Sequence, residues 1–246
     1  MEARFKADGD VIVITGAGNG ICRTLAIEAA RAGAIVAAVD IDDEKLSSLA
    51  AEHENITSYL LDISDRDKVF DTFNAIEGKY EKIDGLVCGA AIQPRISAHE
   101  TSQEEWLKIQ DINLNGVVWC YQAAIQGMIK RQRGSIIAFI SGLAHTGWPE
   151  ASGYAASKAA LIAFSKSAAR EILPHKVRFN IVSPGVIDTP QFRLANPPET
   201  HALIRSIWGI GQPEDVVGPL MFLLSNEASM SGSVLTRDMA FPRSAL

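Results

Sequence analysis

The sequence predicts a single α/β domain over residues 1–246, built on a doubly wound parallel sheet of about seven strands with helices on both faces. Three observations lead to this prediction. Short apolar runs alternate with helical patterns along the whole chain. The first run, 11–14, is continuous and β-branched, which is typical of a strand buried on both faces of a parallel sheet. A glycine-rich turn follows it and opens a helix, as repeated strand–helix units with right-handed crossovers require.

The elements are expected in strict alternation. Residues 102–105 form a capping box that opens the longest expected helix. The segment 190–210 is rich in proline and polar residues, and we interpret it as a mobile substrate lid. Strands are expected at 11–14, 35–39, 56–61, 86–88, 135–140, 177–182 and 233–236, and helices at 20–32, 43–52, 65–80, 102–132, 150–173 and 213–224.

Composition limits the classes of partner. A net charge of −6 and a pI of about 5.4 argue against nucleic acid or an anionic membrane as the main partner. There is no apolar signal core and no apolar run approaching about 18 residues, so we expect no export or membrane span. The cysteines (Cys22, Cys88, Cys120) are odd in number and lack paired spacing, which favours a reducing compartment, the cytoplasm. The five histidines are scattered, and no metal site is expected.

A nucleotide site is predicted where the first expected strand meets the first helix. Gly16 and Gly20 let the backbone approach a pyrophosphate, and the helix N-terminus presents free N–H groups to it, as in Rossmann folds. Asp40 follows the second strand, where a carboxylate accepts hydrogen bonds from ribose hydroxyls. The alternatives are a tight turn without a ligand and an Asp40 that only caps the next helix.

An acid–base group is predicted at the end of the strand at 135–140. Tyr154 and Lys158 are four residues apart and share one helix face, where the ammonium group would lower the pKa of the phenol. Ser141 lies just past the strand and can donate a hydrogen bond to the same substrate oxygen. A Tyr-x-x-x-Lys pattern alone occurs often by chance, so its weight comes from the nucleotide site upstream.

Together these motifs resemble the short-chain dehydrogenase/reductase family over essentially the whole chain. Thr15, Gly16 and Gly20 match its cofactor loop, and Ser141, Tyr154 and Lys158 match its catalytic residues. By this resemblance, the remaining positions expected to bind the cofactor are Asn19, Ile21, Asp40, Ile41, Asp62, Ile63, Ala90, Pro184, Gly185, Ile187 and Thr189, and the family's helix asparagine matches Asn113.

Three segments depart from the family pattern. Cys22 stands where the cofactor loop has its last glycine, and residues 88–91 read Cys-Gly-Ala-Ala in place of Asn-Asn-Ala-Gly. Both departures bear on cofactor affinity more than on the chemistry. Residues 238–240 read Asp-Met-Ala in place of Asp-Gly-Gly, and we expect this tail to reach a neighbouring subunit.

The resemblance implies an NAD-dependent oxidoreductase that transfers a hydride between nicotinamide and a secondary alcohol or ketone. Tyr154 would be the acid–base, and Ser141 would orient the substrate oxygen. Lys158 would bind the nicotinamide ribose and lower the tyrosine pKa, and Asn113 would hold a water that relays the proton. The family resemblance and two long amphipathic helices, 102–132 and 150–173, predict a homotetramer.

The substrate is only broadly predicted. The expected lining is mostly apolar or aromatic, which favours a hydrophobic or cyclic substrate, although each residue may instead belong to the core. His145 and Arg95 are the polar candidates near the cleft. The expected lining residues are Gln93, Leu143, Trp148, Val186, Phe192 and Trp208.

Two alternatives remain open at this stage. One is a 3-oxoacyl-type reductase, whose acidic carrier would dock on Lys130, Arg131 and Arg170. Asp40 disfavours it, because such reductases generally use NADPH. The other is a non-catalytic dinucleotide-binding protein, motivated by Cys22 and the altered segment 88–91 and disfavoured by the intact catalytic residues.

Overall fold

The computed structural model describes residues 5–237, with the backbone alone for residues 207 and 208. Its core is one parallel sheet of seven strands in the order β3-β2-β1-β4-β5-β6-β7, which confirms the predicted fold class. The tail at 238–240, expected to reach a neighbouring subunit, lies outside the described residues. The strands are β1 (Val11–Thr15), β2 (Ile35–Asp40), β3 (Ile56–Leu60), β4 (Gly85–Cys88), β5 (Gly134–Phe139), β6 (Val177–Ser183) and β7 (Val234–Thr236).

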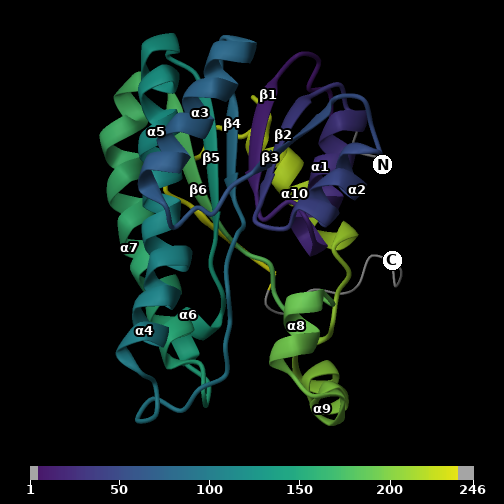
Figure 1. The fold of residues 1–246 in the computed structure, drawn as a ribbon, viewed down its shortest axis with the longest axis vertical. Coiled ribbons are helices and arrows are strands. Elements are labelled where there is room, and N and C mark those ends of the chain that lie inside the picture. Colours follow the sequence, from purple (N-terminus) through teal and green to yellow (C-terminus); the bar gives the residue numbers. More distant parts are fainter. Residues whose placement is uncertain (1–4, 238–246) are drawn as a thin grey trace.

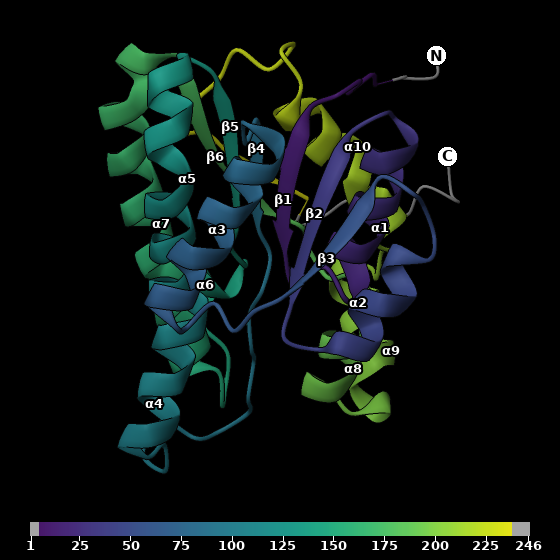
Figure 2. The ribbon, with the colours of Figure 1, turned by 45° about the horizontal axis from the view of Figure 1, so that its top comes forward.

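Helices cover both faces of the sheet (Figures 1 and 2). One face packs against α3 (Arg66–Tyr80), α5 (Gly116–Arg131) and α7 (Ser152–Ile172), the other against α1 (Gly20–Arg31), α2 (Asp43–Ala50) and α10 (Glu214–Leu224). Successive strand residues point to opposite faces, so Val11 and Val13 enter the first core while Ile12 and Ile14 enter the second. Burial on both faces explains why the strands read as continuous apolar runs.

The structure divides the long helix expected at 102–132. It consists of α4 (Gln103–Gln110), a π-helical turn (Asp111–Asn115) and α5, entered through the predicted capping box of Ser102 and Glu105. Apolar spacing does not reveal the π-helical turn, because one extra residue per turn leaves the flanking pattern nearly intact. The turn carries Asn113, which is fully buried.

The segment 190–210, which we interpret from the sequence as a mobile substrate lid, is largely helical in the structure. Residues 190–210 contain α8 (Pro190–Ala195) and α9 (Pro198–Trp208), each with proline in its first turn. Thr189 caps α8 by accepting a hydrogen bond from the Phe192 amide, 3.1 Å away. Two further short helices, α6 (Leu143–Thr146) and the 3₁₀ turn Leu173–His175, were not expected.

The carboxyl ends of the strands open between two groups of helices. Helices α4 and α6 extend beyond the sheet on one side, and α8 and α9 extend on the other (Figure 1). The strand order reverses at β1, since β2 and β3 lie to one side of it and β4, β5 and β6 to the other. Ligands of open α/β sheets bind at such a switch point, outside the carboxyl ends of the strands.

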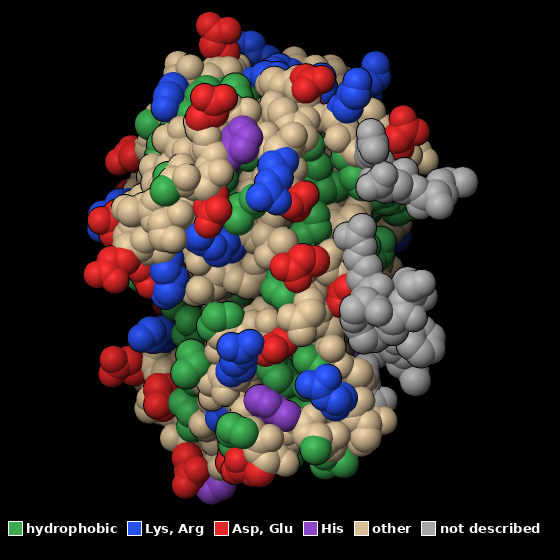
Figure 3. All heavy atoms as spheres, turned by 90° about the vertical axis from the view of Figure 1, so that its right-hand side faces the viewer, with side chains coloured by type: hydrophobic (Ala, Val, Ile, Leu, Met, Phe, Trp, Pro, Cys, Tyr) green, Lys and Arg blue, Asp and Glu red, His purple; other side chains and the backbone are tan. Residues whose placement is uncertain are grey.

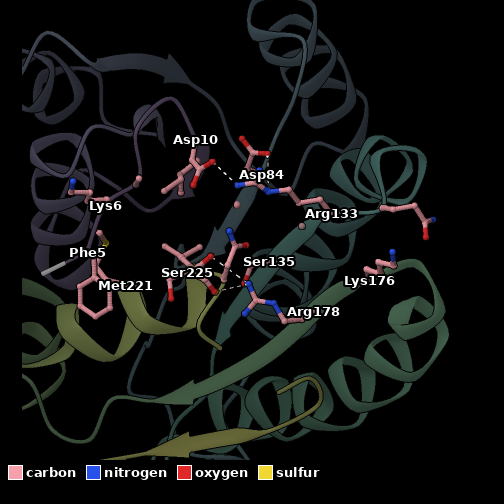
Figure 4. Close-up of a pocket in the computed structure, with 17 residues that line it drawn as sticks. Phe5, Lys6, Asp10, Asp84, Arg133, Ser135, Lys176, Arg178, Met221 and Ser225 are labelled. Carbon is pink, nitrogen blue, oxygen red and sulfur yellow. Dashed lines mark hydrogen bonds and ion pairs between the residues drawn. The ribbon is translucent and has the colours of Figure 1, made fainter. Parts of the chain in front are cut away.

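A smaller hollow of about 230 Å³ lies at the opposite, amino end of the strands (Figure 4). Four of its charged side chains, Asp10, Asp84, Arg133 and Arg178, are engaged in contacts within the fold. Arg133 pairs with Asp10 at 2.8 Å, and Arg178 donates to the carbonyl oxygens of Leu223 and Ser225 at the end of α10. The functional site is therefore sought at the carboxyl end.

The surface agrees with the acidic composition. On the face seen in Figure 3, acidic and basic side chains are interspersed among the described residues, and they do not form a continuous basic patch. Ion pairs among the described residues include Arg31 with Glu28 and Arg193 with Asp188. No helix in the described part of the chain is long and apolar enough to span a membrane.

Candidate active site

A cleft of about 1410 Å³ lies at the carboxyl ends of the strands and collects the predicted site residues. Every residue expected to bind the cofactor lines it, from Gly16 to Thr189, as do Ser141, Tyr154 and Lys158. Asn113 does not line the cleft and lies buried behind it. The fold thus brings together motifs that are spread over more than two-thirds of the chain.

The glycine-rich loop forms the floor of the cleft. Gly16 has a φ of +70°, and a Cβ atom at this position would lie 2.7 Å from the backbone nitrogen of Ala90. Gly20 has a φ of +53° and begins α1 against the side chain of Thr189. The N-cap residue, Asn19, makes no side-chain capping bond, so it leaves the N–H groups of the first turn to a ligand. This geometry suits a pyrophosphate.

Asp40 stands at the end of β2 beside the glycine-rich loop. One carboxylate oxygen accepts the Gly18 amide at 2.8 Å, and the other accepts the Asp42 amide at 3.1 Å. The nearby cation, Lys45, pairs with Asp42. The Asp40 carboxylate is therefore fixed at the wall of the cleft, where the ribose of a dinucleotide would lie.

The segment after β4 is held from two sides. The Thr15 hydroxyl oxygen accepts the amides of Gly89 and Ala90, at 3.1 and 3.4 Å. From the other side, the Asn113 side chain accepts from the Ile92 amide at 2.8 Å and donates to the Ile92 carbonyl at 2.9 Å. Thr15 and Asn113 thus brace a segment that lacks the asparagine side chains of the family pattern.

The two departures from the family pattern near the cofactor loop touch each other. A Cβ atom at Gly89 would overlap with the sulfur of Cys22, so a larger residue at position 89 is incompatible with the cysteine. Cys22 is buried and its thiol is free. The sequence treats these positions as separate weaknesses of the cofactor site. In the structure they form one complementary pair, with the larger side chain on α1 and the smaller residue after β4.

Tyr154 occupies the centre of the cleft and is 9% exposed. Burial raises the pKa of Tyr154 to about 12, while a hydrogen bond with Ser141 and the positive charge of Arg95 act to lower it. The phenol is therefore protonated at neutral pH and is ready to donate its proton. Ser141 also receives the Leu143 amide at 3.2 Å, which fixes its hydroxyl at the start of α6.

Lys158 lies one helical turn beyond Tyr154, as the spacing predicts, and is 3% exposed. Its ammonium nitrogen donates to the Phe139 carbonyl at 2.9 Å and lies 5.7 Å from the centroid of the Tyr154 ring. Burial lowers the pKa of Lys158 to about 8. In this structure the groups that lower the Tyr154 pKa are Ser141 and Arg95. The lowering of that pKa predicted for Lys158 is not seen among them. The ammonium group of Lys158 instead donates to the Phe139 carbonyl.

Asn113 acts through its neighbours in this structure. Besides its two bonds to Ile92, its amide nitrogen donates to the Ser157 hydroxyl at 3.2 Å. Ser157 in turn donates to the Tyr154 carbonyl at 2.7 Å. The Asn113 side chain therefore couples the segment after β4 to α7, the helix that carries Tyr154.

The residues expected to line the substrate site lie along the same cleft, which is lined there by both apolar and polar side chains. Gln93, Leu143, Trp148, Val186 and Phe192 all line it, whereas the side chain of Trp208 lies outside the described residues. The two polar candidates, His145 and Arg95, line it as well. Sequence reasoning missed several further lining residues, for which no motif gave a signal, among them Lys108, Asn196 and Ile204.

Comparisons with known proteins agree with this geometry. A family model described as short chain dehydrogenase matches residues 10–200. The 3-oxoacyl-[acyl-carrier-protein] reductase of Thermotoga maritima is 35% identical over 241 residues, covering 95% of this chain and 98% of that protein. The cyclopentanol dehydrogenase of a Comamonas species is 32% identical over 242 residues, covering 95% and 97%. The crystal structure of a short-chain type dehydrogenase/reductase from Mycobacterium marinum matches with a TM-score of 0.88 at 31% identity, covering 95% of both chains.

The fold and the contents of the cleft define an oxidoreductase of the dinucleotide-binding α/β class. The chain belongs to the short-chain dehydrogenase/reductase family. Within the described residues, no group of three or more His, Cys, Asp or Glu side chains is placed to hold a metal ion.

The contact between Cys22 and Gly89 generates a test by double substitution. We expect Gly89→Asn to lower the free energy of unfolding by about 1–3 kcal/mol, because the new side chain overpacks against the cysteine sulfur. Adding Cys22→Gly should recover most of that loss. Denaturant unfolding of the two single variants and the double variant measures the coupling.

The matched control is Gly78→Asn on α3, where an added Cβ meets nothing within 4 Å. It should change stability little. Strictly additive effects of Cys22→Gly and Gly89→Asn would contradict the pairing.

Proposed function

We propose that this protein is an NAD-dependent dehydrogenase or reductase acting on a secondary alcohol or its ketone. The observation that carries the proposal is the convergence of Ser141, Tyr154 and Lys158 in one cleft with the glycine-rich loop and Asp40. When bound, NAD supplies the hydride acceptor or donor. The protein supplies position, exclusion of water and a proton.

Tyr154 is proposed as the acid–base. Its buried phenol is protonated at neutral pH and can donate to a carbonyl oxygen as that oxygen gains charge. Ser141 already shares a hydrogen bond with this phenol, so its hydroxyl lies close enough to orient the same substrate oxygen. In the oxidative direction the phenol must first lose its proton, and the positive charge of Arg95 favours that loss.

Lys158 and Asn113 are proposed to support this proton transfer. Lys158 would bind the nicotinamide ribose through its ammonium group. Lys158 lines the cleft, and its ammonium group is held by a hydrogen bond to the Phe139 carbonyl. Asn113 would hold the relay water. Its side-chain amide is engaged with Ile92 and Ser157, so the main-chain carbonyl is the group proposed to bind that water.

The proposed substrate has a hydrophobic or cyclic skeleton. The apolar lining provided by Leu143, Val186, Phe192 and Ile204 supports this choice, and so does the similarity to a cyclopentanol dehydrogenase. The cytoplasm is the proposed location, as the cysteine usage favours, and all three cysteines are free in the structure.

Two other functions were considered. Similarity to a 3-oxoacyl-[acyl-carrier-protein] reductase favours an acyl substrate on an acidic carrier. Of the cations expected to dock that carrier, Arg131 is engaged with Glu77 and the Ile83 carbonyl, which weakens this alternative. A non-catalytic dinucleotide-binding role is disfavoured by the complete Ser141, Tyr154 and Lys158 group in the cleft.

We expect Tyr154→Phe to lower kcat by about 10²- to 10⁴-fold while leaving the Kd for NADH within about twofold, because only the proton-transfer group is removed. Absorbance at 340 nm with a panel of cyclic, aromatic and steroid alcohols measures turnover, and fluorescence titration measures NADH binding. Tyr80→Phe is the control, since it removes a phenol that bonds to Thr57 away from the cleft. Wild-type kcat in Tyr154→Phe on a true substrate would refute the assignment.

A second prediction concerns the choice of cofactor. The Asp40 carboxylate would face the 2′-phosphate of NADP as a like charge, so we expect kcat/KM to favour NAD by about a hundredfold or more. Asp40→Ser should reduce this preference at least about tenfold. Steady-state kinetics with both cofactors test the prediction, together with NADH and NADPH titrations that need no substrate.

The control for this experiment is Asp43→Ser, which removes an exposed carboxylate from the first turn of α2. It should leave the cofactor preference unchanged. Two results would contradict the role of Asp40 in cofactor choice. One is equal use of both cofactors by the wild-type protein, and the other is an unchanged NAD-to-NADP ratio of kcat/KM in Asp40→Ser.

A third prediction is a homotetramer. The exposed apolar side chains of Trp106 and Leu107 on α4, and of Leu173 in the 3₁₀ turn after α7, support it. A closed symmetric assembly would bury them. Light scattering at micromolar concentration should give four times the 26.5 kDa chain mass, and a monomer mass would exclude the assembly.

A further inference from the structure

Arg95 lies in the segment between β4 and α4 and lines the substrate end of the cleft. Its three nitrogens each donate to a neutral oxygen. Nε bonds to the Ala195 carbonyl at 2.8 Å, Nη2 to the Asn196 side chain at 2.9 Å, and Nη1 to the Pro149 carbonyl at 3.4 Å. A guanidinium group has five N–H donors, so one N–H on each terminal nitrogen remains for another partner.

Among residues 5–237, the positive charge of Arg95 has no counter-ion in contact with it. No carboxylate within the described part of the chain forms an ion pair with this guanidinium, which is half-buried. Glu150 is the acidic residue whose charge acts on Arg95, and it is exposed. A half-buried charge loses hydration and is normally paired, so an unpaired one beside a catalytic tyrosine indicates a role in binding.

The acidic residues that line the cleft lie at one end of it, and most of the basic ones lie at the other end. Its acidic lining residues, Asp40, Asp42 and Asp62, lie at or just after the ends of strands β2 and β3, at the adenosine end. Lys45 also lines this end and pairs with Asp42. At the substrate end, beyond the catalytic residues, the titratable lining residues of the described chain are Arg95, Lys108 and His145. β1 separates the two ends in the sheet order. The substrate end therefore attracts negative charge, because the acidic residues that line the cleft lie at its other end.

We propose that Arg95 recognises a carboxylate on the substrate, so that the protein acts on an acid with an apolar or cyclic skeleton that carries the reacting hydroxyl or ketone. This inference rests on the proposed function and specifies its substrate class. The two remaining N–H groups sit on neighbouring nitrogens of a planar fork, which matches the two oxygens of a carboxylate. The single negative charge of a carboxylate also matches the single charge of Arg95, while the apolar lining holds the skeleton.

Arg95 also ties the end of α8 to the segment after β4, through Ala195 and Asn196. This tie is a structural role that any test must separate from anion binding. Lysine keeps the charge but loses the fork, whereas methionine keeps much of the length and loses both. A purely structural role predicts equal damage to charged and neutral substrates.

The test compares each acid with its neutral methyl ester. The pairs are 3-oxocyclohexanecarboxylate and 4-oxopentanoate with their methyl esters, reduced by the NADH-loaded protein. In the wild type, we expect kcat/KM for one acid or both to exceed that of the ester by at least about tenfold. Arg95→Met should lower the acid-to-ester ratio of kcat/KM at least about tenfold, with Arg95→Lys between the wild type and Arg95→Met. Any effect of the lost charge on Tyr154 acts on acid and ester alike and cancels in this ratio.

Two further measurements complete the design. Arg193→Met is the matched control, because Arg193 also lies on the lid segment but pairs with Asp188 and does not line the cleft. It should keep the wild-type preference for the acid. Calorimetric titration of the same acids into the NADH complex measures binding without turnover, and we expect binding that Arg95→Met weakens at least about tenfold.

The outcomes separate the two proposals. If Arg95→Met damages acid and ester equally, or if the wild type neither binds nor prefers either acid, carboxylate recognition is overturned. Turnover of neutral cyclic alcohols in that case would leave the proposed function intact. Conversely, Arg95-dependent binding of an acid without turnover of any alcohol or ketone would support the anion site and refute the dehydrogenase assignment.

Discussion

The close approach of the loop after β1 to the segment after β4 is the constraint on which the cleft depends. Gly16 must be glycine because its φ is positive and because Ala90 leaves no room for a Cβ atom. The Thr15 hydroxyl then accepts two amides of the opposing segment, and Gly89 leaves space for the sulfur of Cys22. These contacts set the floor on which a dinucleotide would lie, and they fix the spacing of β1 and β4 at the switch point.

Burial affects the two ionisable groups of the cleft, Tyr154 and Lys158, and for Lys158 it costs stability at neutral pH. Burial of Tyr154 and Lys158 disfavours the charged form of each, which raises the pKa of one to about 12 and lowers the pKa of the other to about 8. For Lys158 the cost is fully present below about pH 8 and is relieved as the pH rises toward the ordinary lysine pKa of 10.5, because the unfolded chain then binds more protons. Such a cost is typical of residues kept for chemistry.

The substrate end is built by parts of the chain that are distant in sequence. Arg95 bonds to Ala195, one hundred residues further on, and Phe192 on the same helix stacks near His201 at 5.0 Å. These contacts order the segment 190–210 into two helices that close one side of the cleft. This wall carries Arg95, whose charge has no ion-pair partner among the described residues, and we propose that it selects the substrate.

The sequence by itself determined the alternating sheet, the glycine-rich loop and the pairing of Tyr154 with Lys158. These features are local, because a strand, a turn or an i, i+4 pair is set by neighbours in the chain. Only the tertiary structure decided that Cys22 and Gly89 complement each other, that a π-helical turn buries Asn113, and that Arg95 has no counter-ion within the described part of the chain. Each of these depends on which distant side chains share one space and on how much water remains around them, and no local pattern in the sequence encodes either quantity.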